Sequence, residues 1–268
     1  MSSKKYVHGY SEREEDRLRD QARALTDLLH HDTHYSSGET VLEAGCGVGA
    51  QTVILARNSV EAVLTSVDIS PDSLAMAQER TAALKLTNVR FQVQDILDLS
   101  YPDEEFHHVF VCFVLEHLPD PAPALAELKR VLRQDGTITV IEGDHGSACF
   151  YPYSAAALKT IKCLIDLQAG AGGDSLIGRR LYPLIAGAGF RNVSVSPRMV
   201  YVDSSRPELV EGFTRNTFTA MVEGVRDQAL EKGLIDEATW DEGIRALYRT
   251  AEADGTFCYT FFKAVGRK

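Results

Sequence analysis

VLEAGCGVGA, residues 41–50, is the stretch that decides the fold. It joins a short apolar run to three alternating glycines, Gly45, Gly47 and Gly49. Glycine readily adopts positive φ, so the chain can turn sharply here and approach a ligand closely. Residues 52–57 predict a helix, whose first backbone N–H groups would point toward the same ligand. A strand, a glycine turn and a helix in this order predict the opening of a nucleotide-binding α/β fold.

Strands and helices alternate outward from this stretch. Further strands are expected at 63–67, 89–93, 109–115, 137–141, 192–202 and 257–265, with helices between most of them and a mostly helical insertion over 206–254. We therefore predict an α/β fold: a Rossmann-like, doubly wound, mostly parallel seven-stranded sheet with a helical cap. The expected domains are a helical lead-in over 1–37, a ligand-binding core over 38–145, and cap insertions with the last two strands over 146–268.

Composition argues against several classes of protein. The chain has 38 acidic and 28 basic residues, a formal charge of −10, which disfavours a nucleic-acid partner. It shows no leader pattern and no uninterrupted apolar run of membrane-spanning length, so no membrane span is expected. The five cysteines are scattered without metal-ligand spacing, which favours a reducing cytoplasm and predicts no metal site.

Acidic residues stand where successive strands are expected to end: Glu43, Asp68 and Asp95. A carboxylate at position 43 would repel a pyrophosphate but attract the ammonium and sulfonium groups of S-adenosylmethionine. Asp68 could accept the ribose hydroxyls, and Asp95 the adenine amino group. The glycine spacing also fits a dinucleotide loop, so an NAD-dependent oxidoreductase is a rival interpretation.

Five stretches, VLEAGCGVGAQT, SVDISPDSL, VQDILDL, FVCFVLEHLPDP and LKRVLRQDGTITV, resemble class I S-adenosylmethionine-dependent methyltransferases, and are similar to the ubiquinone and menaquinone biosynthesis methyltransferase group. The resemblance covers about residues 38–145. It implies S-adenosylmethionine as the cofactor and S-adenosylhomocysteine as its product. The residues that it assigns to the cofactor are Glu43, Gly45, Cys46, Gly47, Gly49, Asp68, Ile69, Asp95, Ile96, Phe113, Val114 and His117, with Tyr10 and Gln21 expected to close over it.

Catalytic candidates follow the fourth and fifth expected strands. His117 is interpreted as a proton acceptor, a pocket wall or a structural histidine of its loop. Glu142, Asp144 and His145 are expected on the same rim, where a carboxylate or an imidazole such as Glu142 or His145 could orient the acceptor or remove its proton. The alternative interpretation of these residues is a polar turn with a helix cap.

The predicted reaction is methyl transfer to oxygen, nitrogen or carbon of a small organic acceptor, with oxygen favoured. The sequence is also compatible with an RNA or protein methyltransferase, or with a non-catalytic protein that binds the cofactor. No pattern in the sequence specifies the acceptor or an oligomeric state.

Overall fold

The computed structural model describes residues 25–268, which divide into two compact units. The core unit comprises Leu29–Glu142, Ile177–Arg198 and Phe262–Lys268. The helical unit comprises Gly143–Leu176 and Met199–Phe261, together with Leu25–Leu28. The core unit thus includes residues 177–198 and 262–268, and the helical unit resumes at Gly143.

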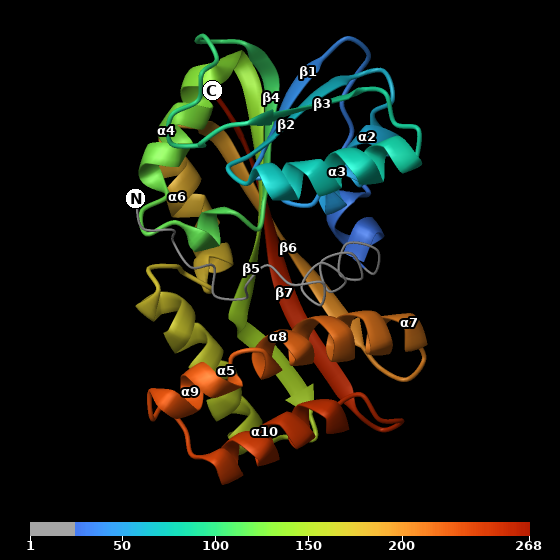
Figure 1. Cartoon of the computed structure of the whole chain (residues 1–268), viewed down its shortest axis with the longest axis vertical. Coiled ribbons are helices and arrows are strands. Elements are labelled where there is room, and N and C mark those ends of the chain that lie inside the picture. Colours follow the sequence, from blue (N-terminus) through green and yellow to red (C-terminus); the bar gives the residue numbers. More distant parts are fainter. Residues whose placement is uncertain (1–24) are drawn as a thin grey trace. The chain divides into compact units, whose positions relative to one another are not determined.

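A seven-stranded sheet has the order β3-β2-β1-β4-β5-β7-β6 (Figure 1). β1 pairs in parallel with β2 and β4, β2 with β3, and β4 with β5, which confirms the predicted mostly parallel sheet. The order reverses between β1 and β4, where α/β folds bind their ligands. The strands are β1 (Thr40–Ala44), β2 (Val63–Asp68), β3 (Val89–Val93), β4 (Phe106–Cys112), β5 (Leu132–Tyr151), β6 (Arg191–Val202) and β7 (Thr256–Arg267).

Four α-helices belong to the core unit: α2 (Ala50–Asn58), α3 (Pro71–Ala83), α4 (Ala122–Val131) and α6 (Leu181–Gly187). Helix α3 begins at a cap that its sequence specifies, because the Ser70 hydroxyl accepts the Ser73 N–H at 3.2 Å and Pro71 occupies the first turn. A short 3₁₀ turn, η1 (Leu115–His117), follows β4, and another, η2 (Ile177–Arg180), precedes α6.

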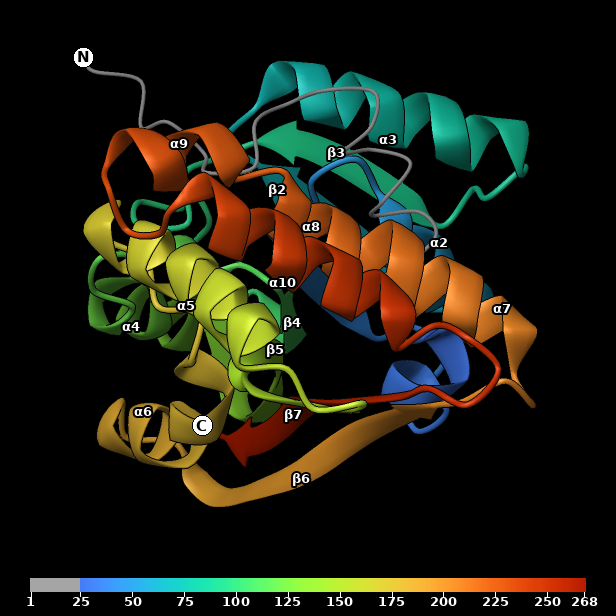
Figure 2. The same cartoon turned by 90° about the horizontal axis from the view of Figure 1, so that it is seen from below.

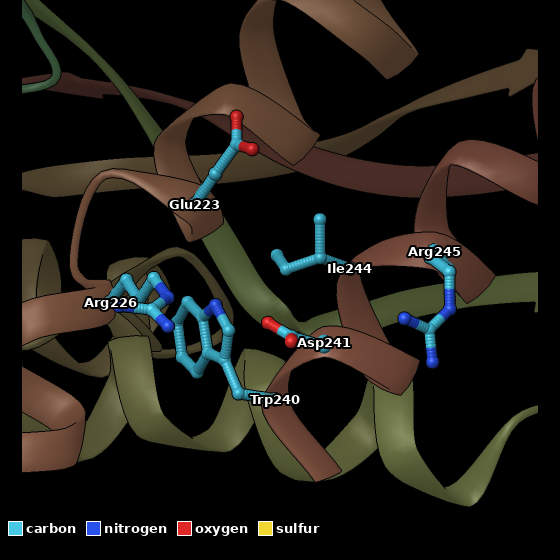
Figure 3. Close-up of a pocket in the computed structure, with 6 residues that line it drawn as sticks. All are labelled: Glu223, Arg226, Trp240, Asp241, Ile244 and Arg245. Atoms are coloured by element: carbon cyan, nitrogen blue, oxygen red, sulfur yellow. The ribbon is translucent and has the colours of Figure 1, made fainter. Parts of the chain in front are cut away.

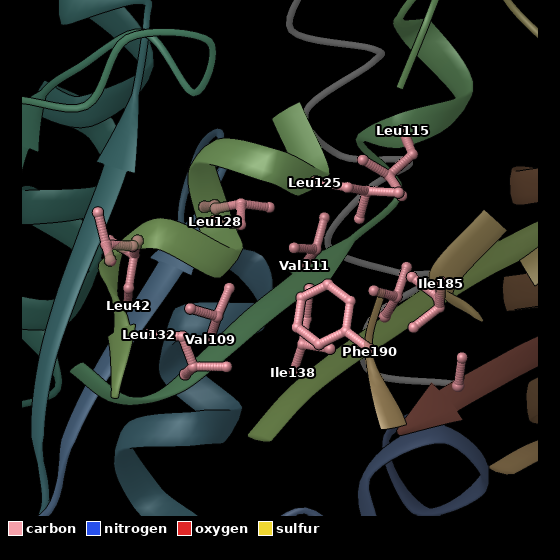
Figure 4. Close-up of a cluster of buried hydrophobic side chains, with 14 of the residues drawn as sticks. Leu42, Val109, Val111, Leu115, Leu125, Leu128, Leu132, Ile138, Ile185 and Phe190 are labelled. Atoms are coloured by element: carbon pink, nitrogen blue, oxygen red, sulfur yellow. The ribbon is translucent and has the colours of Figure 1, made fainter. Parts of the chain in front are cut away.

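The main apolar cluster of the core unit lies between its strands and helices α4 and α6 (Figure 4). Side chains of a strand alternate between faces, so Val109 and Val111 of β4 share one face. They join Leu125 and Leu128 of α4 and Ile185 of α6, all buried. Leu42 and Ala44 of β1 belong to this cluster, so Glu43 between them points to the opposite face of the sheet.

The helical unit contains α5 (Ala155–Gly170), α7 (Pro207–Leu209), the π-helical segment η3 (Val210–Thr219), α8 (Ala220–Glu223), α9 (Arg226–Glu231) and α10 (Glu237–Arg249). Helices α5 and α10 run side by side (Figures 1 and 2). Phe213 and Phe218 of η3 pack against Phe257 and Tyr259 of β7, with ring centroids 4.8 to 6.1 Å apart. All four side chains are buried. None of the helices in residues 25–268 has the length and hydrophobicity needed to cross a bilayer.

The largest differences from the predicted strands concern β4 and β5. β4 covers Phe106–Cys112 instead of 109–115, and β5 covers Leu132–Tyr151 instead of 137–141, so the alternative of a polar turn after Glu142 is wrong. Asp144 and His145 are buried inside this strand, and the His145 ring meets the Tyr259 hydroxyl of β7. The sequence did not show that this stretch continues the strand, because the partner of His145, Tyr259, lies 114 positions later in the chain.

Candidate functional site

The glycine loop after β1 is held by backbone hydrogen bonds. The N–H groups of Gly45 and Cys46 donate to the Val67 carbonyl at 2.8 and 2.9 Å, and Gly49 N–H donates to the Cys46 carbonyl at 3.0 Å. Gly45, Gly47 and Gly49 have φ of 77°, 51° and 77°. The expected sharp turn is therefore present, at the end of β1 and the start of α2.

Close packing also restricts two of these positions to glycine. A Cβ atom at Gly45 would lie 2.5 Å from Val114 Cγ2, beyond the end of β4. At Gly49 it would lie 2.8 Å from Ala77 Cβ, on α3. Position 47 has no atom within 4 Å of a built Cβ, which leaves open space beside its backbone.

Asp68, the last residue of β2, joins the loop to the next helix. Its Oδ2 accepts the Gly47 N–H at 2.8 Å, and its Oδ1 accepts the Ser70 N–H at 2.9 Å. Each carboxylate oxygen has a second lone pair, so these bonds leave acceptor capacity for hydroxyl groups. The side chain thus fixes the loop, and its expected contact with a ribose stays a prediction.

Glu43 lies in the interior beneath the loop, 2% exposed. Its Oε2 accepts the hydroxyls of Thr52 and Ser66, both at 2.6 Å. Its Oε1 is buried and has no hydrogen-bond partner among the described residues. Burial raises the pKa of Glu43 to about 7, helped by the charge of Asp68 and opposed by the two hydroxyls.

The sequence did not identify Thr52 and Ser66 as hydrogen-bond partners of Glu43. Their signal is positional: Ser66 lies opposite Glu43 in the β1–β2 register, and Thr52 stands in the first turn of α2. Both hydroxyls are fully buried, so each needs an acceptor that the neighbouring carboxyl group provides.

Cys46 contributes its backbone to the loop. The thiol is buried, and burial raises its pKa above the ordinary range of cysteine. A thiol in this state is a poor nucleophile, as expected for a residue whose N–H holds the turn.

Residues after β2 and β3 form the next part of the site. Ile69 is 65% exposed, which leaves its side chain accessible to a flat apolar ligand group. Asp95 is exposed, and its Oδ1 accepts the Leu97 N–H at 2.9 Å. Ile96 is half-buried and packs against the apolar cluster of the core unit. Of the expected adenine contacts, Ile69 and Asp95 are therefore accessible, whereas Ile96 is partly covered.

Phe113, directly after β4, has an unusual backbone. Its φ is 58°, a left-handed conformation that is unfavourable for a bulky side chain. Its N–H donates to the Ile141 carbonyl at 2.9 Å, which holds the loop against β5. Such strain often marks a functional position, because surrounding contacts must maintain it.

Glu142 supplies further support for that loop. Its Oε1 accepts the N–H groups of Val114 and Leu115 at 3.0 and 2.8 Å, and its side chain is fully buried. Burial raises the pKa of Glu142 well above its usual range, and the charge of Glu116 adds to this while the backbone donors oppose it. The expected place on an open rim is therefore wrong: the group lies inside the protein.

The two candidate histidines belong to different units. His117 ends η1 in the core unit, where its side chain is 30% exposed and its Nε2 lies 3.5 Å from Glu116 Oε1. His145 belongs to the helical unit, is 6% exposed, and its Nδ1 lies 2.8 Å from the Tyr259 hydroxyl. Tyr10 and Gln21 lie outside the described residues.

A pocket of about 200 Å³ lies in the helical unit, and none of the predicted site residues lines it (Figure 3). It is smaller than the roughly 300–1,000 Å³ typical of ligand pockets. Its lining residues are Glu223, Arg226, Trp240, Asp241, Ile244 and Arg245. Within residues 25–268, no group of three or more His, Cys, Asp or Glu side chains could hold a metal ion.

Residues 42–140 match the family described as methyltransferase domain. The chain carries a methyltransferase domain. The match contains the glycine loop, Asp68, Asp95 and the loop after β4, and it confirms the resemblance to class I S-adenosylmethionine-dependent methyltransferases. The supporting residues Thr52 and Ser66 belong to the same methyltransferase domain.

Individual relatives agree with this domain. The chain is 26% identical over 228 residues to the 27-O-demethylrifamycin SV methyltransferase of Amycolatopsis mediterranei, covering 84% of this chain and 77% of that protein. An uncharacterized Streptomyces fradiae transposon protein is 31% identical over 76% of this chain and 59% of its own length. The chain spans about half the length of the first three curated relatives that it matches.

The fold of the methyltransferase domain also occurs in a protein of another activity. The crystal structure of the cyclase SpnF has a TM-score of 0.54 and 20% identity, covering 94% of this chain and 81% of that one. This likeness shows the fold alone. Activity must therefore be argued from the site.

Proposed function

We propose that the protein transfers a methyl group from S-adenosylmethionine to an oxygen atom of a small organic molecule. The observation that carries the proposal is the buried Glu43 Oε1 beneath the glycine loop, which has no hydrogen-bond partner within the described part of the chain. A buried carboxyl oxygen without a partner is unfavourable, and a cationic donor beside it would remove that cost. The ammonium of the cofactor is such a donor.

The remaining contacts of the cofactor follow from the strand ends. Open space beside Gly47 leaves its backbone accessible, and Asp68 retains lone pairs for the ribose hydroxyls. Ile69 and Asp95 supply an apolar surface and an acceptor for the adenine. When bound, the cofactor supplies an electrophilic methyl group on a sulfonium.

The charge at Glu43 also separates this proposal from its dinucleotide rival. A pyrophosphate above the glycine loop would approach Glu43 and Asp68, whose ionised forms repel it. The methyltransferase domain match supports the same choice. An NAD-dependent oxidoreductase would have to keep the carboxyl groups of Glu43 and Asp68 uncharged or far from the pyrophosphate.

Oxygen is proposed as the methylated atom because the relative from Amycolatopsis mediterranei is named for an O-demethylated substrate. A hydroxyl acceptor benefits from a group that takes its proton. His117 is the proposed base, since its side chain is partly exposed at the end of β4. His145 is the alternative base in the helical unit, whereas Glu142 positions the loop after β4. The cytoplasm is the proposed place of action, in keeping with five free cysteines.

Calorimetric titration with S-adenosylmethionine, S-adenosylhomocysteine and NAD in parallel tests the cofactor. Both sulfur compounds should bind and NAD should not, and Glu43→Gln should weaken the binding of S-adenosylmethionine. Transfer of an isotopically labelled methyl group to 27-O-demethylrifamycin SV and to demethylated quinones then tests the activity. Binding of NAD alone would refute the cofactor. Cofactor binding without transfer to any hydroxyl-bearing acceptor would refute the proposed reaction.

A further inference from the structure

Strands β5 and β7 are neighbours in the sheet, and their contacts fix how their residues oppose one another. Thr260 N–H donates to the Ser147 hydroxyl at 2.9 Å, and the rings of Phe150 and Phe257 stack with centroids 6.3 Å apart. Moving three residues forward on β5 thus corresponds to moving three residues back on β7. The strands are antiparallel here, and this register places Cys149 directly opposite Cys258.

The geometry of this pair suits a covalent bond. Directly opposed residues in antiparallel strands have Cα atoms about 4.5–5.5 Å apart. Disulfides span Cα separations of about 4.4–6.8 Å. Both cysteines are free thiols, and Cys149 lies close enough to Cys258 to contribute to the raised pKa of that thiol. The Cα separation of a directly opposed pair therefore falls within the range that a disulfide spans.

The pair also differs from the other cysteines in its exposure. Cys149 is exposed and Cys258 is half-buried, whereas Cys46, Cys112 and Cys163 are buried. On β7 the exposure alternates, so Cys258 and Thr260 lie on the less covered face while Phe257 and Tyr259 are buried. A small reagent can therefore reach this pair in the folded protein.

We propose that Cys149 and Cys258 form a dithiol site that a low-molecular-weight disulfide, such as oxidised glutathione, converts reversibly into an intrachain disulfide. The Cys149 thiolate attacks one sulfur of the reagent, forming a mixed disulfide and releasing one reduced thiol. The Cys258 thiolate then attacks Cys149 Sγ, forming the cross-strand bond and releasing the second reduced thiol. The two cysteines lose two protons and two electrons, and the reagent disulfide gains them.

The order of attack follows from the surroundings. Burial, with the neighbouring Cys149, raises the pKa of Cys258 to about 11, so its thiolate is scarce in solution at neutral pH. Cys149 is the more exposed thiol and meets the reagent first. Once the mixed disulfide forms, Cys258 lies opposite its target sulfur, and this proximity compensates for its high pKa. Exposed disulfides are more easily reduced than buried ones, so thiols should reverse the reaction.

The test uses the purified full chain with oxidised glutathione, followed by intact mass and by peptide mapping without reduction. The wild type should lose the mass of two hydrogens and yield one linked peptide pair containing Cys149 and Cys258; dithiothreitol should restore both thiols. Cys258→Ser should instead accumulate glutathione on Cys149. Cys149→Ser should react at least roughly tenfold more slowly, since only the less exposed thiol remains.

Cys163→Ser is the matched control, because Cys163 is a buried cysteine of the same unit. It should behave like the wild type, and circular dichroism should show that all three variants are folded. A wild-type product that keeps glutathione on Cys149 beside a free Cys258 would overturn the proposal. So would a disulfide that includes any other cysteine. The result is independent of methyl transfer, because no cofactor or acceptor takes part.

Discussion

Replacing Gly49 with alanine should destabilise the core unit more than the same replacement at Gly38. Both residues have φ of 77°, so an alanine at either position meets the same backbone strain. They differ in their surroundings. A Cβ atom at Gly38 has no atom within 4 Å, whereas at Gly49 it lies 2.8 Å from Ala77 Cβ and 3.0 Å from Ala77 Cα.

The magnitude follows from these two contributions. Left-handed backbone costs a non-glycine residue about 1–2 kcal/mol, which is the whole effect expected for Gly38→Ala. Overpacking against a helix backbone adds about 1–3 kcal/mol at Gly49. Gly49→Ala should therefore lower the free energy of unfolding by about 2–5 kcal/mol in total.

Urea denaturation followed by circular dichroism measures both variants under one set of conditions. Adding Ala77→Gly to Gly49→Ala removes the nearest atom and should recover part of the loss, in excess of what additive effects predict. Equal destabilisation by Gly38→Ala and Gly49→Ala would refute the reasoning. The same holds if the Ala77→Gly change brings no recovery.

The remaining predictions concern the three carboxyl groups of the site. Glu142→Ala should cost about 2–6 kcal/mol in urea unfolding, because two buried N–H groups lose their acceptor at about 1–3 kcal/mol each. Glu142→Gln keeps an acceptor for the two N–H groups. The free energy of unfolding of this variant, compared with that of the wild type, should increase as the pH rises above the ordinary pKa range of glutamate. The raised pKa of Glu142 in the folded state makes the wild type lose stability there; a pH-independent difference would contradict this. Affinity for S-adenosylmethionine should fall as pH drops below the pKa of Glu43, about 7. Protonation of this one group can lower the affinity by at most about tenfold per pH unit. Calorimetry of Glu43→Gln should show no such pH dependence. In Asp68→Asn, the side-chain NH₂ group would face the N–H of Gly47 or of Ser70, which can no longer donate to it. Cofactor binding should weaken at least roughly tenfold. An unchanged affinity would remove Asp68 from the site.

Local patterns predicted most of the core unit. Glycines at 45, 47 and 49, and the Ser70-Pro71 start of α3, specify their conformations through neighbours in sequence, so the first βαβ unit was predictable. The end of β5 was not, because the partner of His145 comes from β7, more than a hundred residues later in the chain. An isolated run of Glu, Gly, Asp and His has the composition of a turn.

The candidate site shows the same division. Carboxyl residues at the ends of β1, β2 and β3 could be found by position alone. Their hydrogen bonds could not, since Glu43 depends on Ser66 across the sheet, and Glu142 on a loop 27 residues earlier. Burial of Glu142 also depends on packing from several elements, which turned an expected catalytic group into a structural one.

The glycine loop is fastened by the protein's own atoms, through the Val67 carbonyl and the Asp68 carboxylate. Its conformational entropy is therefore lost during folding rather than during ligand capture. Ligand binding should then require no slow conformational change of the loop. The amide protons of Gly45, Cys46 and Gly47 should exchange with solvent slowly even in the free protein, so this part of the site would be silent in hydrogen-exchange comparisons of free and bound forms.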